Sequence, residues 1–371
     1  MDLKSLVEMS RRYGSDENYV LAGGGNTSYK DSNVLYVKSS GTQLSDITPE
    51  QFVAMDLQRL RDMAKTENPQ NKSDKEREAK ALTDMMSARL PGEEHKRPSV
   101  EAILHAIFPY TYVLHTHPAL INGMTCSKRG EKACWELFGD TAVWIGLTKP
   151  GLLLAQVCDK AFDEYTTKTG SYPRMVFLEN HGVFAAADSV SEVDGIMEQA
   201  VKKISEFVSK APGQSGIAIN DGPEYSTAPE LNTNQTEDGT VQARFCSNKL
   251  VMSYVLDQTS LKPVIKPFTP DHIVYCRDEP LFLENDTDVS ADFKKYFGRK
   301  GYLPSIVVIR GLGFFAMGTT ATAAERARVL FLDAMKIARY AESFGGANPL
   351  TEEFTQFILN WEAETYRKSI S

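Results

Sequence analysis

Three histidines in two separate segments have the residue type and the spacing needed to hold a metal ion. His115 and His117 are separated by one residue in the apolar segment YVLHTHPAL. Alternate side chains of a β-strand share one face, so both imidazoles can reach the same ion. A catalytic zinc ion takes about three protein ligands and keeps one position open. His181, in an Asn-His-Gly turn between two apolar segments, is the natural third ligand.

Glu101 lies in the sequence RPSVEAILHAIFP, which predicts a short helix with Ser99 as its N-cap. The apolar residues of this helix form one stripe, and Glu101 lies off the stripe. A carboxylate in the first helical turn is stabilised by the helix dipole, which is a complete structural explanation. The functional alternative is a general base or an extra metal ligand beside the histidines. His105, one turn later, is either a hydrogen-bonding support of this site or a core histidine.

Two glycine-rich turns offer backbone N–H groups to an anion. Residues 23–28 (GGGNTS) include Asn26 and Thr27, and residues 38–42 (KSSGT) include Ser40 and Gly41. Turns of this kind, with hydroxyl groups beside them, hold phosphate without net positive charge. Neither turn matches a Walker loop or a dinucleotide-binding glycine motif.

The surrounding pattern predicts a mixed α/β fold that positions these residues. Short strands are expected at 34–39, 113–117, 175–178 and 183–187, and Ser189 with Glu192 predicts the capped start of a long helix. Residues 66–80 read as a solvated loop that enters a helix. Residues 212–240, rich in Gly, Pro, Asn, Thr and Ser, read as a domain boundary. We therefore predict a catalytic domain at 1–211, a linker at 212–243 and a C-terminal α/β region at 244–371.

The C-terminal region contains an echo of the catalytic domain. The sequence FLENHGVFAAADSVSEVDGIMEQA, from Phe177, resembles VIRGLGFFAMGTTATAAERARVLF, from Val308. Both predict strand, glycine turn, strand and capped helix, and Leu312 stands where the first copy has His181. The echo is a degenerate partial repeat that has lost a metal ligand, or it consists of two unrelated units of similar composition.

Composition limits the kinds of partner. The formal charge of -8 and pI near 5.4 provide no general attraction to nucleic acid or to anionic membranes. No apolar run reaches the roughly 20 residues that span a bilayer, and no signal peptide is recognised at the start, so a cytoplasmic location is expected. The five scattered cysteines suit reduced thiols in a core.

Taken in order, the motifs GGGNTSYK, VKSSGTQLSDIT, PSVEAILH, YVLHTHPALI, KPG at 149–151 and LENHGVFAAA resemble the class II aldolase/adducin family. They span nearly all of residues 20–208. The later segments FTPDHIVYC, RGLGFFAMG and NWEAETYRKS resemble the aldolase part of bifunctional rhamnulose-1-phosphate aldolase/lactaldehyde dehydrogenase proteins. The resemblance implies a three-layer α/β/α fold, a homo-oligomer, with a tetramer favoured, and active sites between subunits.

The resemblance also implies roles for individual residues. His115, His117 and His181 correspond to ligands of Zn²⁺ or another divalent metal, and Glu101 corresponds to the acid/base and to a fourth ligand. Asn26, Ser40, Gly41 and Ser99 correspond to residues around the substrate phosphate, and Thr27 of the first glycine turn is added to them. Val100 stands where some fuculose-phosphate aldolases carry a second serine, which removes one hydroxyl from the phosphate site.

The implied function is that of a lyase. A phosphorylated ketose, such as rhamnulose 1-phosphate or fuculose 1-phosphate, would be cleaved reversibly to dihydroxyacetone phosphate and an aldehyde through a zinc-stabilised enediolate. Two alternatives stay open: a pentulose-phosphate 4-epimerase of the same fold, and a non-catalytic interaction module as in adducin.

Overall fold

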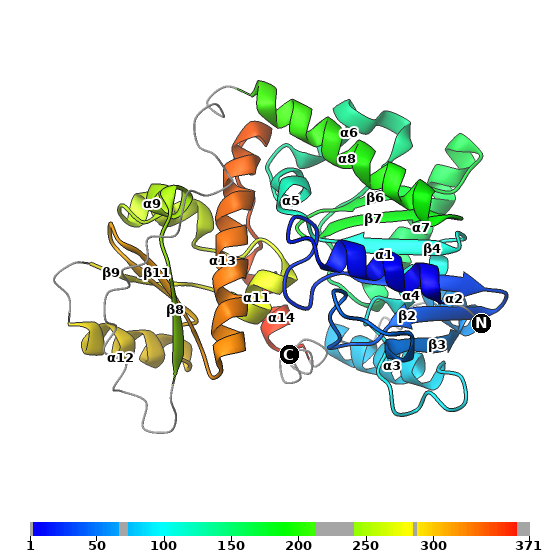
Figure 1. Ribbon diagram of the computed structural model, residues 1–371, viewed down its shortest axis with the longest axis horizontal. Helices are drawn as coiled ribbons and strands as arrows, with labels where there is room; N and C mark the ends of the chain where they lie inside the picture. The colour runs from blue at the N-terminus through cyan, green and yellow to red at the C-terminus, as the bar shows by residue number, and fades with distance from the viewer. Residues whose placement is uncertain (1–2, 67–72, 212–240, 285–287, 362–371) are drawn as a thin grey trace. The chain divides into compact units, whose positions relative to one another are not determined.

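Two β-sheets, one of seven strands and one of four, form the framework of the protein in the computed structural model (Figure 1). Residues 3–66, 73–211, 241–284 and 288–361 are described. The chain divides into unit 1, chiefly Met1–Ile121 and Arg129–Ser205, and unit 2, which comprises Asn122–Lys128 and Glu206–Lys368. Most of the predicted linker at 212–243 lies outside the described residues, and Gln242 and Ala243 already belong to a strand.

The sheet of unit 1 has the strand order β3-β2-β1-β4-β7-β6-β5. Neighbouring strands are antiparallel except β5 and β6, which are parallel. Every residue of β6 and β7 is buried, as expected for apolar strands in the middle of a covered sheet. The strands are β1 Asn26–Asp31, β2 Val34–Lys38, β3 Phe52–Asp56, β4 Tyr112–Thr116, β5 Val143–Ile145, β6 Met175–Leu178 and β7 Gly182–Ala187.

Helices cover both faces of this sheet, which gives the three-layer α/β/α fold that the family resemblance implies. One buried cluster joins the sheet to α2, α3, α4 and α7. On the opposite face lie α1 and α8 (Figure 1), which are linked by the Tyr13 hydroxyl donating to Asp194 at 2.9 Å. The helices that begin before residue 206 are α1 Lys4–Gly14, α2 Leu57–Lys65, α3 Asp74–Ser87, α4 Ala102–Ile107, α5 Ala119–Thr125, α6 Gly130–Phe138, α7 Leu152–Thr169 and α8 Val190–Lys210.

The starts of two helices show where local sequence decides the structure and where it does not. Ser189 caps α8 as predicted, because its Oγ accepts the backbone N–H of Glu192 at 3.3 Å. The prediction for α4 was wrong in two respects: the N-cap is Glu101 rather than Ser99, and all six helical residues are buried rather than one stripe. Ser99 instead accepts the N–H of Glu101 at 3.3 Å, and its own N–H donates to the Lys38 carbonyl at 3.0 Å.

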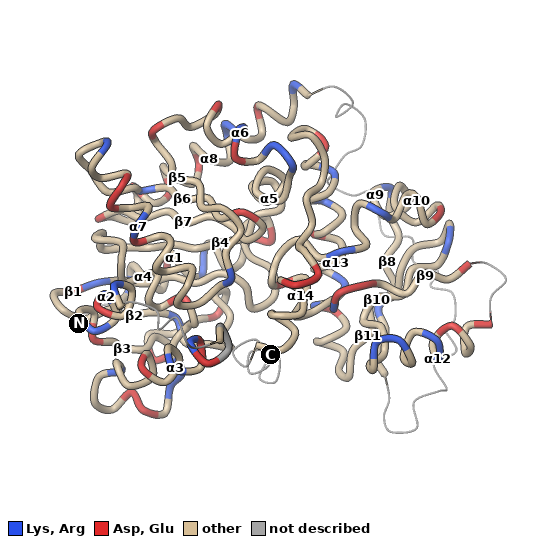
Figure 2. Tube along the Cα trace, turned by 180° about the vertical axis from the view of Figure 1, so that it is seen from behind, with Lys and Arg blue, Asp and Glu red and all other residues tan. Residues whose placement is uncertain are grey.

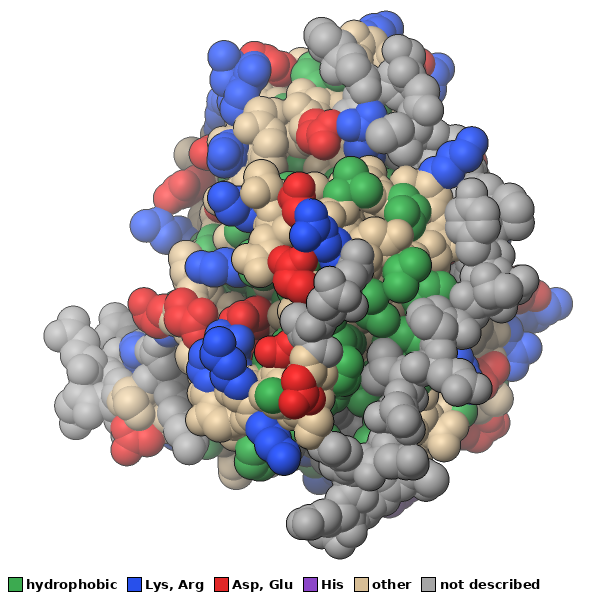
Figure 3. Space-filling view, turned by 90° about the vertical axis from the view of Figure 1, so that its left-hand side faces the viewer, with side chains coloured by type: hydrophobic (Ala, Val, Ile, Leu, Met, Phe, Trp, Pro, Cys, Tyr) green, Lys and Arg blue, Asp and Glu red, His purple; other side chains and the backbone are tan. Residues whose placement is uncertain are grey.

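Unit 2 contains a sheet with the order β8-β11-β10-β9. Its strands are β8 Gln242–Cys246, β9 Leu281–Leu283, β10 Ile306–Ile309 and β11 Gly313–Gly318. Its helices are α9 Lys249–Tyr254, α10 Gln258–Leu261, α11 Pro270–Cys276, α12 Val289–Lys300, α13 Ala321–Ala341 and α14 Glu352–Leu359. One face of the sheet forms an apolar cluster with Tyr296 of α12, and Phe245 at the edge of this cluster is only half-buried. Figure 3 shows hydrophobic side chains grouped on one face of the surface.

The four strands of unit 2 repeat the topology of β4, β7, β6 and β5. In both sets the first strand pairs antiparallel with the second, the second pairs antiparallel with the third, and the third pairs parallel with the fourth. The turns between the paired strands also match, since Asn180 and Gly311 both have positive φ, 55° and 67°. Because four strands share the same order and direction, we favour a degenerate partial repeat rather than two unrelated units of similar composition.

The distribution of charged residues and the state of the cysteines agree with what the composition predicts. Figure 2 shows basic and acidic residues interspersed along the chain in both units. All five cysteines are buried and none forms a disulfide with another, as predicted. Among the helices of the described ranges, none combines the length and the apolar character that crossing a membrane requires.

Gly313 provides a test of the turn in unit 2. A Cβ at this position would lie 2.5 Å from the Cys246 carbonyl oxygen, and the residue has φ of 150°. We expect Gly313→Ala to destabilise the protein by about 1–3 kcal/mol, measured by scanning calorimetry of the full chain.

Gly298→Ala is the matched control, because nothing lies within 4 Å of a Cβ on this exposed glycine of α12. Helix propensity predicts a gain of about 1 kcal/mol there. Equal stability of Gly313→Ala and wild type would contradict the account of the turn.

Candidate metal centre

His115, His117 and His181 meet at one end of the central strands of unit 1. One potential ligand nitrogen from each residue lies within 4.8 Å of the others. His115 is on β4 and is fully buried. His117 follows the end of β4 rather than lying within the strand, and its N–H donates to the Tyr19 carbonyl at 3.2 Å. His181 is in the turn between β6 and β7.

Gly182 allows this turn to lie close to β4. A Cβ at this position would lie 2.5 Å from the Thr116 carbonyl oxygen and 2.7 Å from a ring carbon of His117. Any larger residue would therefore push the turn, and His181 with it, away from the other two histidines. The strand pairing supplies the rest of the geometry, because His115 lies opposite Phe184 on β7.

Strand β7 also fixes the orientation of the His115 ring. The Nδ1 atom is 3.0 Å from the Val183 carbonyl oxygen, so it carries the proton and donates. The ring stacks on Phe184 with centroids 4.1 Å apart. Burial holds the pKa of His115 well below its usual value, so the ring is neutral. The Nε2 lone pair then faces the cluster, 2.8 Å from Nε2 of His117.

Glu101 is the acidic residue of the cluster. Its Oε2 atom is 3.6 Å from Nε2 of His115, and its Oε1 atom is 3.4 Å from Nε2 of His181. Oε2 also accepts a hydrogen bond from the Asn26 amide at 2.6 Å. Burial raises the pKa of Glu101, but the His181 imidazole, the Asn26 hydrogen bond and the His117 imidazole outweigh burial and hold this pKa below its usual range. The group is therefore a carboxylate.

These residues fit a divalent metal ion. Three imidazoles make a set of ligands that suits zinc, and the backbone bond of His115 is the kind of outer contact that orients a ligating histidine. Oε1 of Glu101 is buried and accepts no hydrogen bond from the described residues. An oxygen in this state is expensive to bury unless a cation or a substrate group compensates it.

The residues assigned to phosphate do not all lie together. The Asn26 amide donates to Ser99 Oγ at 3.3 Å as well as to Glu101. Ser40 lies beside the same segment, because its N–H donates to the Arg97 carbonyl at 2.8 Å, and Gly41 follows with φ of 84°. Thr27 is on the other face of β1, where its hydroxyl lies 2.7 Å from Ser10 of α1. The structure thus does not bring Thr27 to the other four.

His105 is buried beside the cluster, and its contacts could not be read from the local sequence. Nδ1 lies 2.7 Å from Ser28 Oγ, and Nε2 contacts Asn26 Oδ1. Asn26 and Ser28 share one face of β1, which is the only sequence signal that relates them. Phe184 and Val183, which orient His115, were also missed, because only the pairing of β4 with β7 identifies them.

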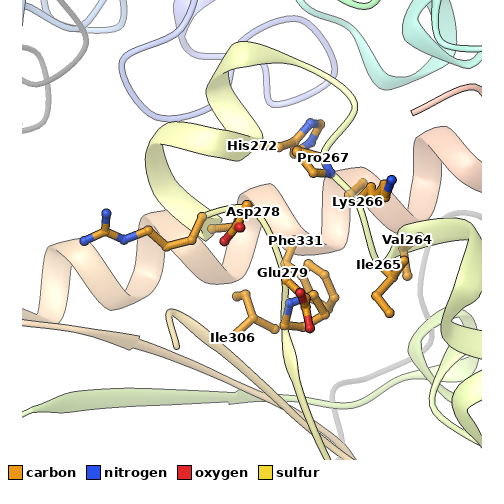
Figure 4. Close-up of a pocket in the computed structure, with 13 residues that line it drawn as sticks. Val264, Ile265, Lys266, Pro267, His272, Asp278, Glu279, Ile306 and Phe331 are labelled. Atoms are coloured by element: carbon orange, nitrogen blue, oxygen red, sulfur yellow. The ribbon is translucent and has the colours of Figure 1, made fainter. Parts of the chain in front are cut away.

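The remaining histidines have structural or solvated places. His95 is exposed in a loop. His272 lies at the pocket of unit 2 shown in Figure 4. Its Nδ1 accepts the Thr269 N–H at 3.2 Å, and its Nε2 lies 3.2 Å from Asp333. Nδ1 therefore caps the start of α11, and Nε2 joins α11 to α13.

The repeat in unit 2 retains the strand pairing of the metal centre but has no histidine at the three ligand positions. Phe315 pairs with Phe245 as Phe184 pairs with His115, so Phe245 takes the place of His115. In the same register Ser247 replaces His117 and Leu312 replaces His181. Within the described residues, the only cluster of histidine, cysteine or acidic side chains with metal-ligand spacing is the one in unit 1.

Comparison with known proteins gives one curated relative and several solved structures. "Uncharacterized oxidoreductase YuxG" of Bacillus subtilis is 22% identical over 422 aligned residues, which cover all of this chain but only 58% of that protein. The N-terminal class II aldolase domain of a Thermoplasma acidophilum protein is 26% identical, with TM-score 0.47, over 56% of this chain and 94% of its own. The L-fuculose-1-phosphate aldolase of Thermus thermophilus is 16% identical, with TM-score 0.37, over 56% and 96%.

The family described as Class II Aldolase and Adducin N-terminal domain matches residues 4–203, which include every residue of the metal centre. Because this match spans more than half of the 371 residues, the chain belongs to the class II aldolase and adducin family.

Proposed function

We propose that the protein is a metal-dependent class II aldolase. It would reversibly cleave a phosphorylated ketose, such as rhamnulose 1-phosphate or fuculose 1-phosphate, into dihydroxyacetone phosphate and an aldehyde. The observation that carries the proposal is the convergence of three imidazoles on a buried carboxylate, Glu101, with Oε1 of that carboxylate left without a hydrogen bond among the described residues. Membership of the family supports the lyase class.

His115, His117 and His181 would hold a divalent cation, zinc in the first instance. Such a cation supplies Lewis-acid stabilisation of the negative charge that develops on oxygen when the carbon–carbon bond breaks. The neutral state of His115 suits this role, because a ligand must offer its lone pair. The Val183 carbonyl keeps that lone pair directed at the cluster.

Glu101 would move the proton between carbon and solvent. Its lowered pKa keeps it ionised, as a base must be before it accepts a proton. The Asn26 amide holds Oε2, so Oε1, which lies 3.4 Å from Nε2 of His181, is the oxygen left to act.

The substrate phosphate would bind at the segments that contain Asn26, Ser40, Gly41 and Ser99. The antiparallel bridge between Ser39 and Pro98 brings these segments together next to Glu101. We leave Thr27 out of this group because its hydroxyl is bonded toward α1.

A pentulose-phosphate 4-epimerase is the second candidate, since the same metal and proton chemistry would serve it. A non-catalytic module is less favoured, because a buried carboxylate among imidazoles is costly to maintain without a ligand. The oxidoreductase description of the Bacillus subtilis relative is not transferred, since the sequence has no dinucleotide glycine motif. The cytoplasmic location, the homotetramer and the domain limits stay predictions.

Removal of one imidazole should remove the metal. We expect wild type to carry about one zinc per chain and His181→Ala to lose most of it, because a site with three protein ligands falls to two. Metal content after dialysis, measured by plasma mass spectrometry, checks this. His95→Ala, an exposed histidine outside the cluster, should keep full metal content. Undiminished zinc in His181→Ala would remove this residue from the metal site.

Glu101→Gln should separate metal binding from turnover. The amide keeps the shape of the side chain but cannot accept the proton, so kcat should fall by roughly 10²–10⁴ while zinc content stays unchanged. Glu8→Gln, on the exposed surface of α1, is the control and should match wild type in both measurements. A fully active Glu101→Gln enzyme would exclude Glu101 from the mechanism.

A screen of ketose 1-phosphates tests the reaction itself. We expect dihydroxyacetone phosphate and a free aldehyde in coupled assays, loss of both products with a chelator, and recovery with added zinc. Formation of the C4 epimer without free aldehyde would favour the epimerase. No turnover of any phosphorylated ketose by the zinc-loaded protein would refute the aldolase assignment.

A further inference from the structure

We propose that His105 is a positioning residue that fixes the orientation of the Asn26 amide and, through it, the carboxylate of Glu101. Its catalytic consequence rests on the aldolase function proposed above. The orientation itself is a property of the fold and can be tested separately.

A continuous line of hydrogen-bonded side chains runs through the core to Glu101. Ser28 Oγ is 2.7 Å from Nδ1 of His105, and Nε2 of His105 contacts Asn26 Oδ1. The Asn26 amide nitrogen is 2.6 Å from Oε2 of Glu101. His105 and Ser28 have no exposed surface, and Asn26 and Glu101 have less than a tenth.

The chemistry at Glu101 sets the direction of every bond in this line. A carboxylate only accepts, so the Asn26 amide must turn its N–H groups toward Glu101. Oδ1 of Asn26 then faces His105 and can only accept, so Nε2 of His105 must carry the proton. In the neutral ring Nδ1 is left as an acceptor, and the Ser28 hydroxyl donates to it.

The opposite arrangement is unfavourable at each contact. With the proton on Nδ1, the lone pair of Nε2 would face Oδ1 of Asn26. If the amide rotated to relieve this contact, its oxygen would face Oε2 of Glu101. Either change leaves buried polar atoms without partners. By donating from Nε2 to Oδ1, His105 therefore stabilises the amide orientation that holds Oε2 of Glu101, and the second oxygen, Oε1, lies 3.4 Å from Nε2 of His181.

His105 could instead be a core histidine that serves only packing, since its ring lies edge-on to Phe184 with centroids 5.5 Å apart. Three substitutions distinguish the two roles. Gln places an amide nitrogen near the position of Nε2, Asn reaches only the position of Nδ1, and Phe keeps the ring without either nitrogen.

We expect His105→Gln to retain most of the wild-type kcat. His105→Asn and His105→Phe should lose about 10- to 100-fold in kcat, with little change in KM and with zinc content retained. A packing role predicts the reverse order, with Phe the mildest substitution. Equal activity of the Asn and Gln variants, or loss of zinc in all three, would overturn the proposal.

Double variants with Glu101→Gln test whether the effect passes through Glu101. If it does, Glu101→Gln/His105→Asn should be no slower than Glu101→Gln alone, because the base that His105 positions is already absent. A further loss of about 10-fold in the double variant would show that His105 acts elsewhere.

Nitrogen-15 NMR of the full chain provides a measurement that does not depend on activity. With histidine labelled and His105→Gln used to assign its signals, we expect His105 to be the neutral Nε2–H tautomer in wild type. The Nδ1–H tautomer or the charged imidazolium would overturn the positioning role. If the expected tautomer is found but no ketose phosphate is cleaved, the aldolase function is refuted, whereas the conclusion that His105 orients the Asn26 amide remains valid.

Discussion

The position of β4 between β1 and β7 is the constraint on which the metal centre depends. His115 lies opposite Asn26 on β1 and opposite Phe184 on β7. The backbone pairing of these three strands therefore fixes together the His115 ring, the Asn26 amide that holds Glu101, and the Phe184 ring on which His115 stacks. The His181 turn immediately precedes β7 and is carried by the same pairing. A shift of one residue in either ladder would turn these side chains to the opposite face of the sheet.

Burial gives these polar groups their chemical character. His115 and His105 remain neutral because the charged ring is poorly solvated in the core, and burial lowers the pKa of His105 to about 3. Glu101 is buried to a similar degree, yet it stays ionised because the His181 imidazole, the hydrogen bond from the Asn26 amide and the His117 imidazole oppose the effect of burial on its pKa. One environment thus provides neutral ligands and a charged base side by side, which water-exposed residues of the same types would not do.

Local sequence is sufficient for features that depend on neighbouring residues. The His-x-His spacing, the Asn-His-Gly turn and the Ser189 cap each follow from short-range geometry. It is insufficient where partners come from distant strands. The sequence predicts Ser99 as the cap of α4, but the helix begins only at Ala102, so the Ser99 hydroxyl accepts the N–H of Glu101, which is itself the cap residue, and the Ser99 N–H pairs with the Lys38 carbonyl. Thr27 faces Ser10, and Ser28 faces His105, because the register of β1 assigns alternate residues to opposite faces.

Gly182 and Gly313 close equivalent turns in the two units. A Cβ at Gly182 would lie 2.5 Å from the Thr116 carbonyl oxygen, and a Cβ at Gly313 would lie 2.5 Å from the carbonyl oxygen of the equivalent residue, Cys246. Unit 2 keeps this glycine although Phe245, Ser247 and Leu312 offer no imidazole. The glycine beside His181 is therefore required by backbone packing, whether or not the turn carries a metal ligand. A chain of this architecture can lose its reactivity through side chains alone while its scaffold remains intact, so the presence of the glycine turn by itself does not identify an active enzyme.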